Sequence, residues 1–153
     1  MNNEIQTGDF YVAGISVRTT NAGGQSMKDI GELWGRFFAE NISAKIPGKV
    51  SADIYSIYTD YESDHTGLYT TLLGCRVSSV EDLPEGMTGK KIPGGKCMKF
   101  TCKGKIPDVI AAQWANIWND KTLRRSFTSD YEVYNERAQN PADAEVDIFV
   151  AVK

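Results

Sequence analysis

The pattern of apolar and polar positions divides the chain into six short stretches and two longer ones. The short stretches are rich in β-branched and aromatic residues, which favours strands; they cover residues 10–19, 51–58, 68–77, 96–102, 130–136 and 145–153. In the longer stretches apolar residues recur every three or four positions, as on one face of an amphipathic helix. The first carries Ile30, Leu33, Trp34, Phe37, Phe38 and Ile42, and the second carries Ile110, Trp114, Ile117 and Trp118, with the polar Gln113 at the same spacing. This mixture predicts an α+β fold.

Local signals mark where these elements begin and where the chain turns. Ser26 is expected to cap the first helix, with Asp29 three residues later. Pro107 is expected at the first position of the second helix, where its missing N–H is harmless. Gly14, inside the first strand, indicates a bulge or a close approach of another group to the backbone. Residues 78–95 are rich in Gly and Pro and are expected to connect two halves.

The two halves repeat the same order of elements, strand, helix, strand, strand. The helical stripes correspond at a constant offset of 80 residues (110 minus 30), so that Ile30, Trp34, Phe37 and Phe38 match Ile110, Trp114, Ile117 and Trp118. Residues 51–58 likewise resemble residues 129–134, and both contain Tyr-x-x-Tyr. We therefore expect one domain, residues 1–153, with repeats over about 8–78 and 95–153. Two β-α-β-β units of this kind can join into one antiparallel sheet with two helices and a central cleft, and ligand sites often lie at such interfaces.

Glu132 places a carboxylate inside a predicted strand, among tyrosines. Side chains alternate along a strand, so Tyr131 and Val133 point to one face and Glu132 and Tyr134 to the other. A carboxylate that is enclosed among rings attracts organic cations through its charge and through the ring faces. The alternative is a solvated face, because charged residues are rarely fully buried. In the repeat alignment Glu132 falls opposite Ser56, so the duplication is symmetric in fold and asymmetric in charge.

Composition excludes several other classes of function. A net charge of -3 without a basic stripe argues against direct nucleic-acid binding. No apolar run reaches the length of a membrane span, and residues 1–4 do not have the character of a secretory signal. Three cysteines without such a signal favour reduced thiols and a cytoplasmic location. Cys, His and carboxylates do not gather at metal-ligand spacing, and His65 is the only imidazole for a Ser-His-Asp site. We predict no metal, no cofactor and no catalytic triad.

A series of short motifs runs in order through nearly the whole chain. They are Val12-Ala13-Gly14, Leu33-Trp34-x-x-Phe37, Tyr55-Ser56-Ile57-Tyr58, Tyr69 followed by Gly74, Pro84-x-Gly86, Pro93-Gly94-Gly95, and Trp114 and Arg125 ahead of residues 129–134. In this order and spacing they resemble the GyrI-like small-molecule-binding domains, which are the effector-binding domains of AraC-type and MerR-type multidrug-responsive regulators.

The resemblance implies a duplicated β-α-β-β fold whose cleft binds bulky, hydrophobic, often cationic compounds against a carboxylate. The position matching that carboxylate is Glu132, and the residues expected to line the cleft with it are Tyr134, Trp114, Tyr55 and Tyr69, with Trp34 and Trp118 assigned either to the lining or to the core. Without a helix-turn-helix, the chain is expected to act as a free-standing binder that senses or sequesters a drug or effector. The alternatives are a small hydrolase of electrophilic compounds with Glu132 as base, and a protein-interaction module directed at a gyrase-type partner. The edge strands of such a sheet would also allow a homodimer.

Overall fold

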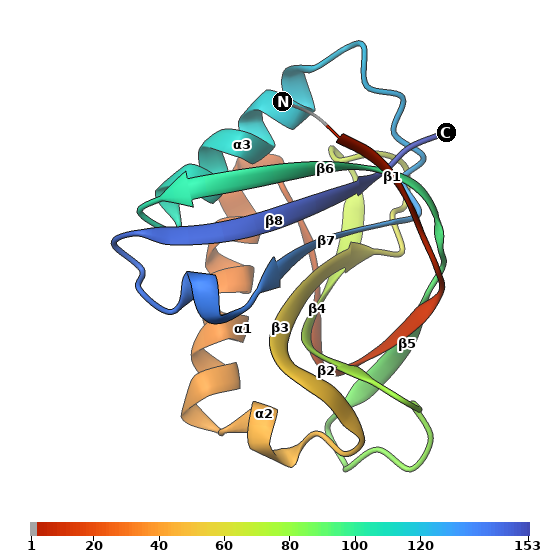
Figure 1. Cartoon of the computed structure of the whole chain (residues 1–153), viewed down its shortest axis with the longest axis vertical. Helices are drawn as coiled ribbons and strands as arrows, with labels where there is room; N and C mark the ends of the chain where they lie inside the picture. Colours follow the sequence, from red (N-terminus) through yellow and green to blue (C-terminus); the bar gives the residue numbers. More distant parts are fainter. Residues whose placement is uncertain (1–2) are drawn as a thin grey trace.

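The computed structural model describes residues 3–153, which form a curled eight-stranded antiparallel sheet with its helices on one side (Figure 1). The strands are β1 Asn3–Thr7, β2 Phe10–Thr20, β3 Lys49–Thr59, β4 Leu68–Val77, β5 Thr88–Ile92, β6 Gly95–Gly104, β7 Ser129–Tyr134 and β8 Ala144–Ala151. The α-helices are α1 Gln25–Ala39, α2 Ile42–Lys45 and α3 Asp108–Asn119, and two 3-10 turns cover η1 Ala22–Gly24 and η2 Glu136–Ala138.

The order of the strands is symmetric about the centre of the sheet. It runs β1-β6-β8-β7-β3-β4-β2-β5, so β7 and β3 lie side by side in the middle and each half adds further strands outward. In one half α1 connects β2 to β3, and in the other α3 connects β6 to β7. This arrangement confirms the predicted α+β fold of two joined β-α-β-β units.

Two strands, β1 and β5, lie outside the predicted set, and β5 lies within residues 78–95, the segment that was expected to connect the two halves. β1 pairs with β6 and β5 pairs with β2, on either side of short corners at Gly8-Asp9 and Pro93-Gly94. The backbones of these two corners lie very close together, because a Cβ on Gly94 would lie 2.5 Å from the carbonyl oxygen of Thr7. Both strands are only five residues long and rich in polar residues, so only pairing with distant segments makes them strands.

The helix ends differ from the sequence signals by one or two residues. α1 begins at Gln25 after Gly24, and Ser26 is a buried residue of its first turn instead of the cap. Pro107 precedes α3 instead of opening it. The apolar stripe does not continue as one helix to Ile42, because Asn41 takes a left-handed conformation with a φ of 51° and a separate short helix follows.

Each half has its own apolar cluster beneath its helix, and a third cluster fills the opposite side of the sheet. α1 packs on β2 and β4 through Leu33 and Phe37, and α3 packs on β6 and β8 through Ile110 and Ile117. The third cluster contains Phe10, Val12, Ile57, Leu72, Ile92, Tyr131 and Val133. The sheet therefore buries both of its faces.

Gly14 illustrates how tightly the strands pack. It is the direct partner of Gly74 in the β2–β4 ladder, and a Cβ on Gly14 would lie 2.0 Å from the carbonyl oxygen of Leu73. The predicted close approach to the backbone is thus made by the neighbouring strand.

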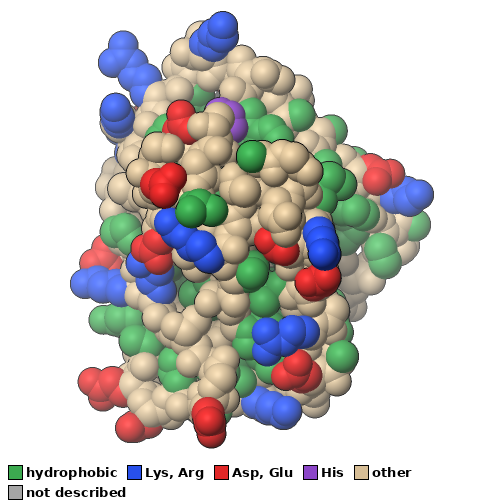
Figure 2. All heavy atoms as spheres, turned by 180° about the vertical axis from the view of Figure 1, so that it is seen from behind, with side chains coloured by type: hydrophobic (Ala, Val, Ile, Leu, Met, Phe, Trp, Pro, Cys, Tyr) green, Lys and Arg blue, Asp and Glu red, His purple; other side chains and the backbone are tan. Residues whose placement is uncertain are grey.

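The surface carries charges of both signs. Figure 2 shows acidic and basic side chains interspersed over one face, with apolar side chains between them. Among the helices of residues 3–153, none is long and apolar enough to cross a membrane.

Candidate functional site

The two faces of β7 have different surroundings. Tyr131 and Val133 pack into the apolar cluster on the side away from the helices. Glu132 and Tyr134 point to the side that α1 and α3 cover, as strand alternation predicts. Glu132 pairs directly with Ser56 of β3, so its carboxylate lies at the junction of the two halves.

Glu132 is almost completely enclosed, with 2% of its surface exposed. Its Oε2 accepts hydrogen bonds from the Tyr58 hydroxyl and from the Trp114 indole Nε1–H, both at 2.7 Å. Its Oε1 accepts a short hydrogen bond from the Tyr134 hydroxyl. The three donors come from β3, α3 and β7, so elements of both halves converge on one carboxylate.

The donors around Glu132 are all neutral. Among residues 3–153, Glu132 forms no ion pair with Lys, Arg or His. Burial raises the pKa of this carboxyl, and the three hydrogen bonds lower it by less than burial raises it. Burial and the neighbouring carboxylate both raise the pKa of Tyr58 and of Tyr134 well above the usual value, so both remain protonated donors.

Aromatic rings surround this group on the helix side. The Tyr58 ring contacts Tyr69 edge-on, with ring centroids 6.0 Å apart. The Trp34 ring contacts Tyr134 edge-on at 4.9 Å and stacks on Phe38 at 5.8 Å. Phe38 is 63% exposed, so the rings form a path from the neighbourhood of Glu132 to the surface of α1. Rings therefore occupy the space over the carboxylate, which is not exposed to an open cleft.

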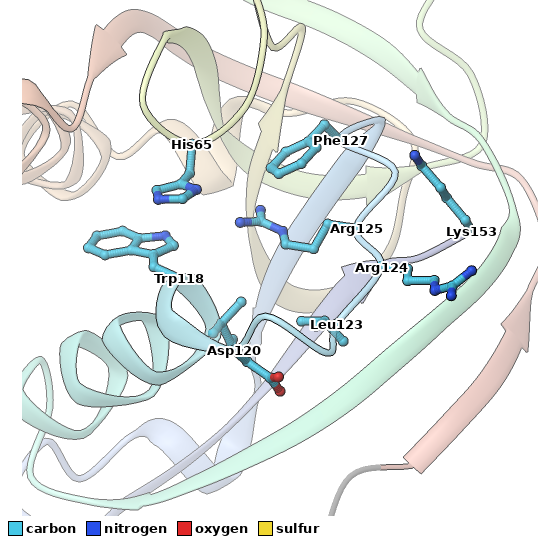
Figure 3. A pocket seen from close by; sticks show the side chains of 9 residues that line it. His65, Trp118, Asp120, Leu123, Arg124, Arg125, Phe127 and Lys153 are labelled. Atoms are coloured by element: carbon cyan, nitrogen blue, oxygen red, sulfur yellow. The ribbon is translucent and has the colours of Figure 1, made fainter.

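Apart from Tyr55, the predicted lining residues fall into three positions. Tyr134 and Trp114 bond to Glu132, and Tyr69 and Trp34 contact the rings next to it. Trp118 lies at the far end of α3, where its ring stacks on His65 at 5.7 Å and lines a separate cavity (Figure 3).

Tyr55 does not join this group. It pairs with Val133, so its side chain points to the opposite face, where its ring packs near Phe10 and Tyr131. The residue in its place is Tyr58, which the sequence analysis did not select. The signal was present: Tyr58 occupies the position of Tyr134 in the repeated Tyr-x-x-Tyr, and it shares a strand face with Ser56.

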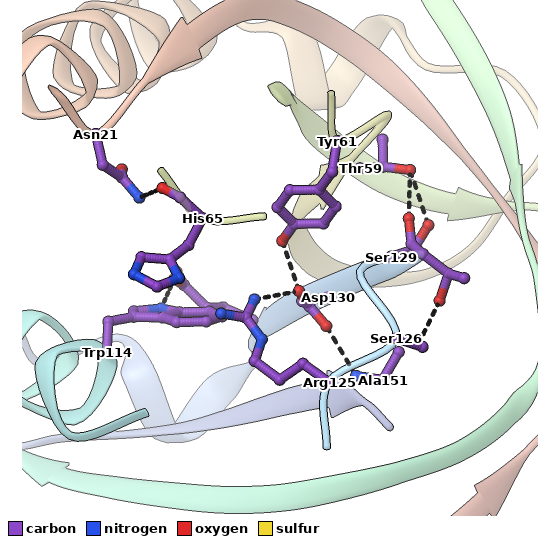
Figure 4. Close-up of polar contacts among 12 residues, drawn as sticks. Asn21, Thr59, Tyr61, His65, Trp114, Arg125, Ser126, Ser129, Asp130 and Ala151 are labelled. Carbon is purple, nitrogen blue, oxygen red and sulfur yellow. Dashed lines mark hydrogen bonds and ion pairs between the residues drawn. The ribbon is translucent and has the colours of Figure 1, made fainter. Parts of the chain in front are cut away.

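Asp130 is a second buried carboxylate that the sequence analysis did not single out. It is fully buried, and its oxygens accept hydrogen bonds from Arg125 Nη2 at 2.7 Å, the Tyr61 hydroxyl at 2.5 Å and the backbone N–H of Ala151 at 2.8 Å (Figure 4). Unlike Glu132, Asp130 has a cationic partner. The Arg125 guanidinium also lies over the Trp114 ring, 5.8 Å from its centroid.

Comparison with known proteins places this geometry in a family. Residues 5–152 match Cass2, the integron-associated effector binding protein. YobU of Bacillus subtilis strain 168, named as a candidate transcriptional regulator, is 32% identical over 145 residues, which cover 92% of this chain and 91% of YobU.

Two solved structures show the same fold. An integron cassette protein from Vibrio cholerae is 31% identical with a TM-score of 0.75, over 99% of this chain and 95% of that one. SAV2435, solved bound to tetraphenylphosphonium, is 16% identical with a TM-score of 0.82, over 100% and 94% of the two chains. The family match spans both halves of the sheet, the helices over them and the buried Glu132 between them; the chain belongs to the Cass2 family of integron-associated effector-binding proteins.

Proposed function

We propose that this effector-binding protein takes up bulky hydrophobic cations, with Glu132 as the anionic anchor. The observation that carries the proposal is a buried carboxylate held by three neutral donors, without an ion-pair partner among the described residues. Such a group is costly to bury, and a cation beside it recovers Coulombic energy that neutral donors do not supply. The raised pKa of Glu132 has the same cause, because the three hydrogen bonds do not fully offset the cost of burying the charge.

The surrounding rings favour a particular kind of cation. Aromatic faces attract cations, and they also offer apolar area to the body of a hydrophobic one. The tyrosines and tryptophans beside Glu132 supply such faces, and a delocalised organic cation loses less hydration energy on burial than an ammonium ion. A lipophilic cation therefore fits this site better than a small hydrated ion.

Access to the carboxylate requires side chains to move. Trp34 and Phe38 of α1 form the outer end of the ring path, and Phe38 is exposed while Trp34 is half-buried. Rotation of these two side chains would open a route between α1 and α3 without breaking the sheet ladder. An exposed side chain such as Phe38 changes rotamers on a ps–ns timescale, and Trp34 would have to move with it.

The comparisons support small-molecule binding in general terms, and SAV2435 is a protein of this fold solved with a lipophilic cation. The family resemblance to multidrug regulators points in the same direction. Both oxygens of Glu132 already accept hydrogen bonds, which favours binding over the hydrolase alternative. Such binding would serve either to sense or to sequester a toxic compound.

The test is calorimetric titration of the protein with tetraphenylphosphonium. We expect binding to the wild type and a loss of about tenfold or more in affinity for Glu132→Gln, which corresponds to at least about 1.4 kcal/mol. Glu136→Gln is the matched control, because it removes the same charge from an exposed residue four positions along the chain. Tetraphenylborate has the same shape and the opposite charge, so it tests whether the site distinguishes a positive ligand from a negative one. We expect it to bind more weakly than tetraphenylphosphonium.

Equal affinity of the wild type and Glu132→Gln for tetraphenylphosphonium would refute the assignment of Glu132 as the anchor. Unchanged binding in Glu136→Gln, with weakened binding in Glu132→Gln, would support it.

A further inference from the structure

A cavity with a volume of about 460 Å³ lies on the far side of Trp114 from Glu132, among the His65 loop, the end of α3 and residues 120–127 (Figure 3). This volume is in the range of small-molecule sites. The charged side chains that line it are mostly basic: Arg124, Arg125 and Lys153, with Asp120 as the one acidic residue. Its character is thus opposite to that of the Glu132 site.

Arg125 is the buried polar group of this cavity. Only 8% of its surface is exposed, and its Nη2 donates to Asp130. Its Nε and Nη1 are buried and have no hydrogen-bond partner among the described residues. A guanidinium has five N–H donors, and these two nitrogens carry three of them. Buried donors are nearly always bonded, so these three donors are available to an acceptor that enters the cavity.

Aromatic rings, and no hydrogen-bond acceptors among the described residues, lie next to the Nε and Nη1 atoms of Arg125. Phe127 lies against the guanidinium at 4.4 Å from its ring centroid, on the side that lines the cavity. The backbone of Phe127 has a φ of 55°, which is unfavourable for a bulky residue and is often found at functional sites. Because this ring both contacts the guanidinium and lines the cavity, its displacement would bring the free nitrogens closer to the cavity.

The rim of the cavity adds positive charge, and its walls are apolar. Arg124 and Lys153 lie side by side, joined by a backbone hydrogen bond of 2.8 Å from the Lys153 N–H to the Arg124 carbonyl. Asp120 is engaged by the Thr122 N–H and hydroxyl, at 2.9 and 2.6 Å. Trp118, 39% exposed, provides a flat wall, and the His65 ring stacks on one of its two faces.

We propose that this cavity binds a planar aromatic carboxylate, with the carboxylate on Arg125 and the ring against Trp118. Arginine suits this role because its planar fork matches the geometry of a carboxylate. Arg124 and Lys153 steer the anion to the opening. The proposal stands apart from the function proposed for Glu132, because the two sites bind ligands of opposite charge and share only the Trp114 ring between them.

The test is calorimetric titration with naphthalene-2-carboxylate, compared with the neutral naphthalene-2-carboxamide of nearly the same shape. We expect the carboxylate to bind and the carboxamide to bind at least tenfold more weakly. Arg124→Glu and Lys153→Glu should each weaken carboxylate binding several-fold. Lys121→Glu, the same charge change beside the cavity but outside its lining, should change the affinity by less than twofold.

Arg125 is tested together with its partner, since removing it alone leaves Asp130 buried without a cation. The double variant Arg125→Gln and Asp130→Asn keeps a neutral hydrogen-bonding pair, and circular dichroism checks that it folds. We expect its affinity for the carboxylate to fall at least tenfold. Equal affinity for carboxylate and carboxamide, no binding of either by the wild type, or wild-type affinity in the folded double variant would each overturn the proposal. Should the double variant not fold, the carboxamide and the rim variants still support or overturn the proposal.

Discussion

Replacing Glu132 with Gln should make the protein more stable near pH 8, although Glu132 makes three hydrogen bonds. Gln has nearly the same shape, so its carbonyl oxygen can accept from Tyr58 and Trp114. Its amide can donate to the Tyr134 hydroxyl oxygen once that hydroxyl turns. The substitution thus removes a charge and leaves the number of hydrogen bonds unchanged.

The size of the effect follows from two opposing contributions. Bonds to a charged acceptor exceed neutral ones by about 1 kcal/mol each, so three such bonds favour the carboxylate by about 3 kcal/mol. Burying an ion costs several kcal/mol, on the order of 5, after the surroundings relax. The difference predicts that the Gln variant is more stable by about 1–2 kcal/mol. The raised pKa of Glu132 agrees, because it shows that the folded protein favours the neutral form of this side chain.

The effect depends on pH with a definite sign. The pKa of Glu132 is higher in the folded state than in the unfolded state, so folding favours the protonated form. Below the unfolded pKa, about 4.3, both states hold the proton and this stability is fully present. As the pH rises through the folded pKa, the wild type loses that stability and the Gln variant does not. The two proteins should therefore be similar near pH 4 and diverge towards pH 8.

Urea unfolding followed by tryptophan fluorescence, at about pH 4 and about pH 8, measures both free energies of unfolding. Glu136→Gln again serves as the control for a general change in net charge. A Gln variant that is less stable than the wild type at pH 8 by about 1 kcal/mol or more would refute the reasoning, because the carboxylate would then be stabilised by its surroundings.

Three further predictions concern the frame around the site. Gly14→Ala should destabilise the protein by more than about 2 kcal/mol because its Cβ would clash with β4, whereas Gly31→Ala, in open space on α1, should stabilise it by about 0.5–1 kcal/mol; urea unfolding measures both. Arg125→Met should cost about 3–5 kcal/mol in thermal unfolding, and adding Asp130→Asn should recover most of the loss. Cys102, whose pKa burial raises to about 11, should react with a thiol reagent at pH 8 only as fast as the protein unfolds, and rapid labelling of the native state would contradict its burial.

Local pattern was sufficient for the elements that bury an apolar face. The stripe through Leu33 and Phe37 predicts α1, and the repeat of that stripe predicts α3, because periodicity along a helix depends only on nearby residues. Strand alternation likewise predicts that Glu132 and Tyr134 share a face. Short polar strands such as β1 and β5 carry no such signal, since they form only by pairing with segments far along the chain.

The sequence by itself determined the α+β class, the joined β-α-β-β units and the placing of a carboxylate among rings. Only the tertiary structure decided which rings reach that carboxylate, because Tyr58 and Glu132 are 74 positions apart and meet through the register of β3 on β7. The same register turned Tyr55 to the other face. The pairing of Arg125 with Asp130, and the free donors that it leaves, depends on how residues 124–126 pair with residues 151–153 at the end of the chain, and no local pattern predicts that contact.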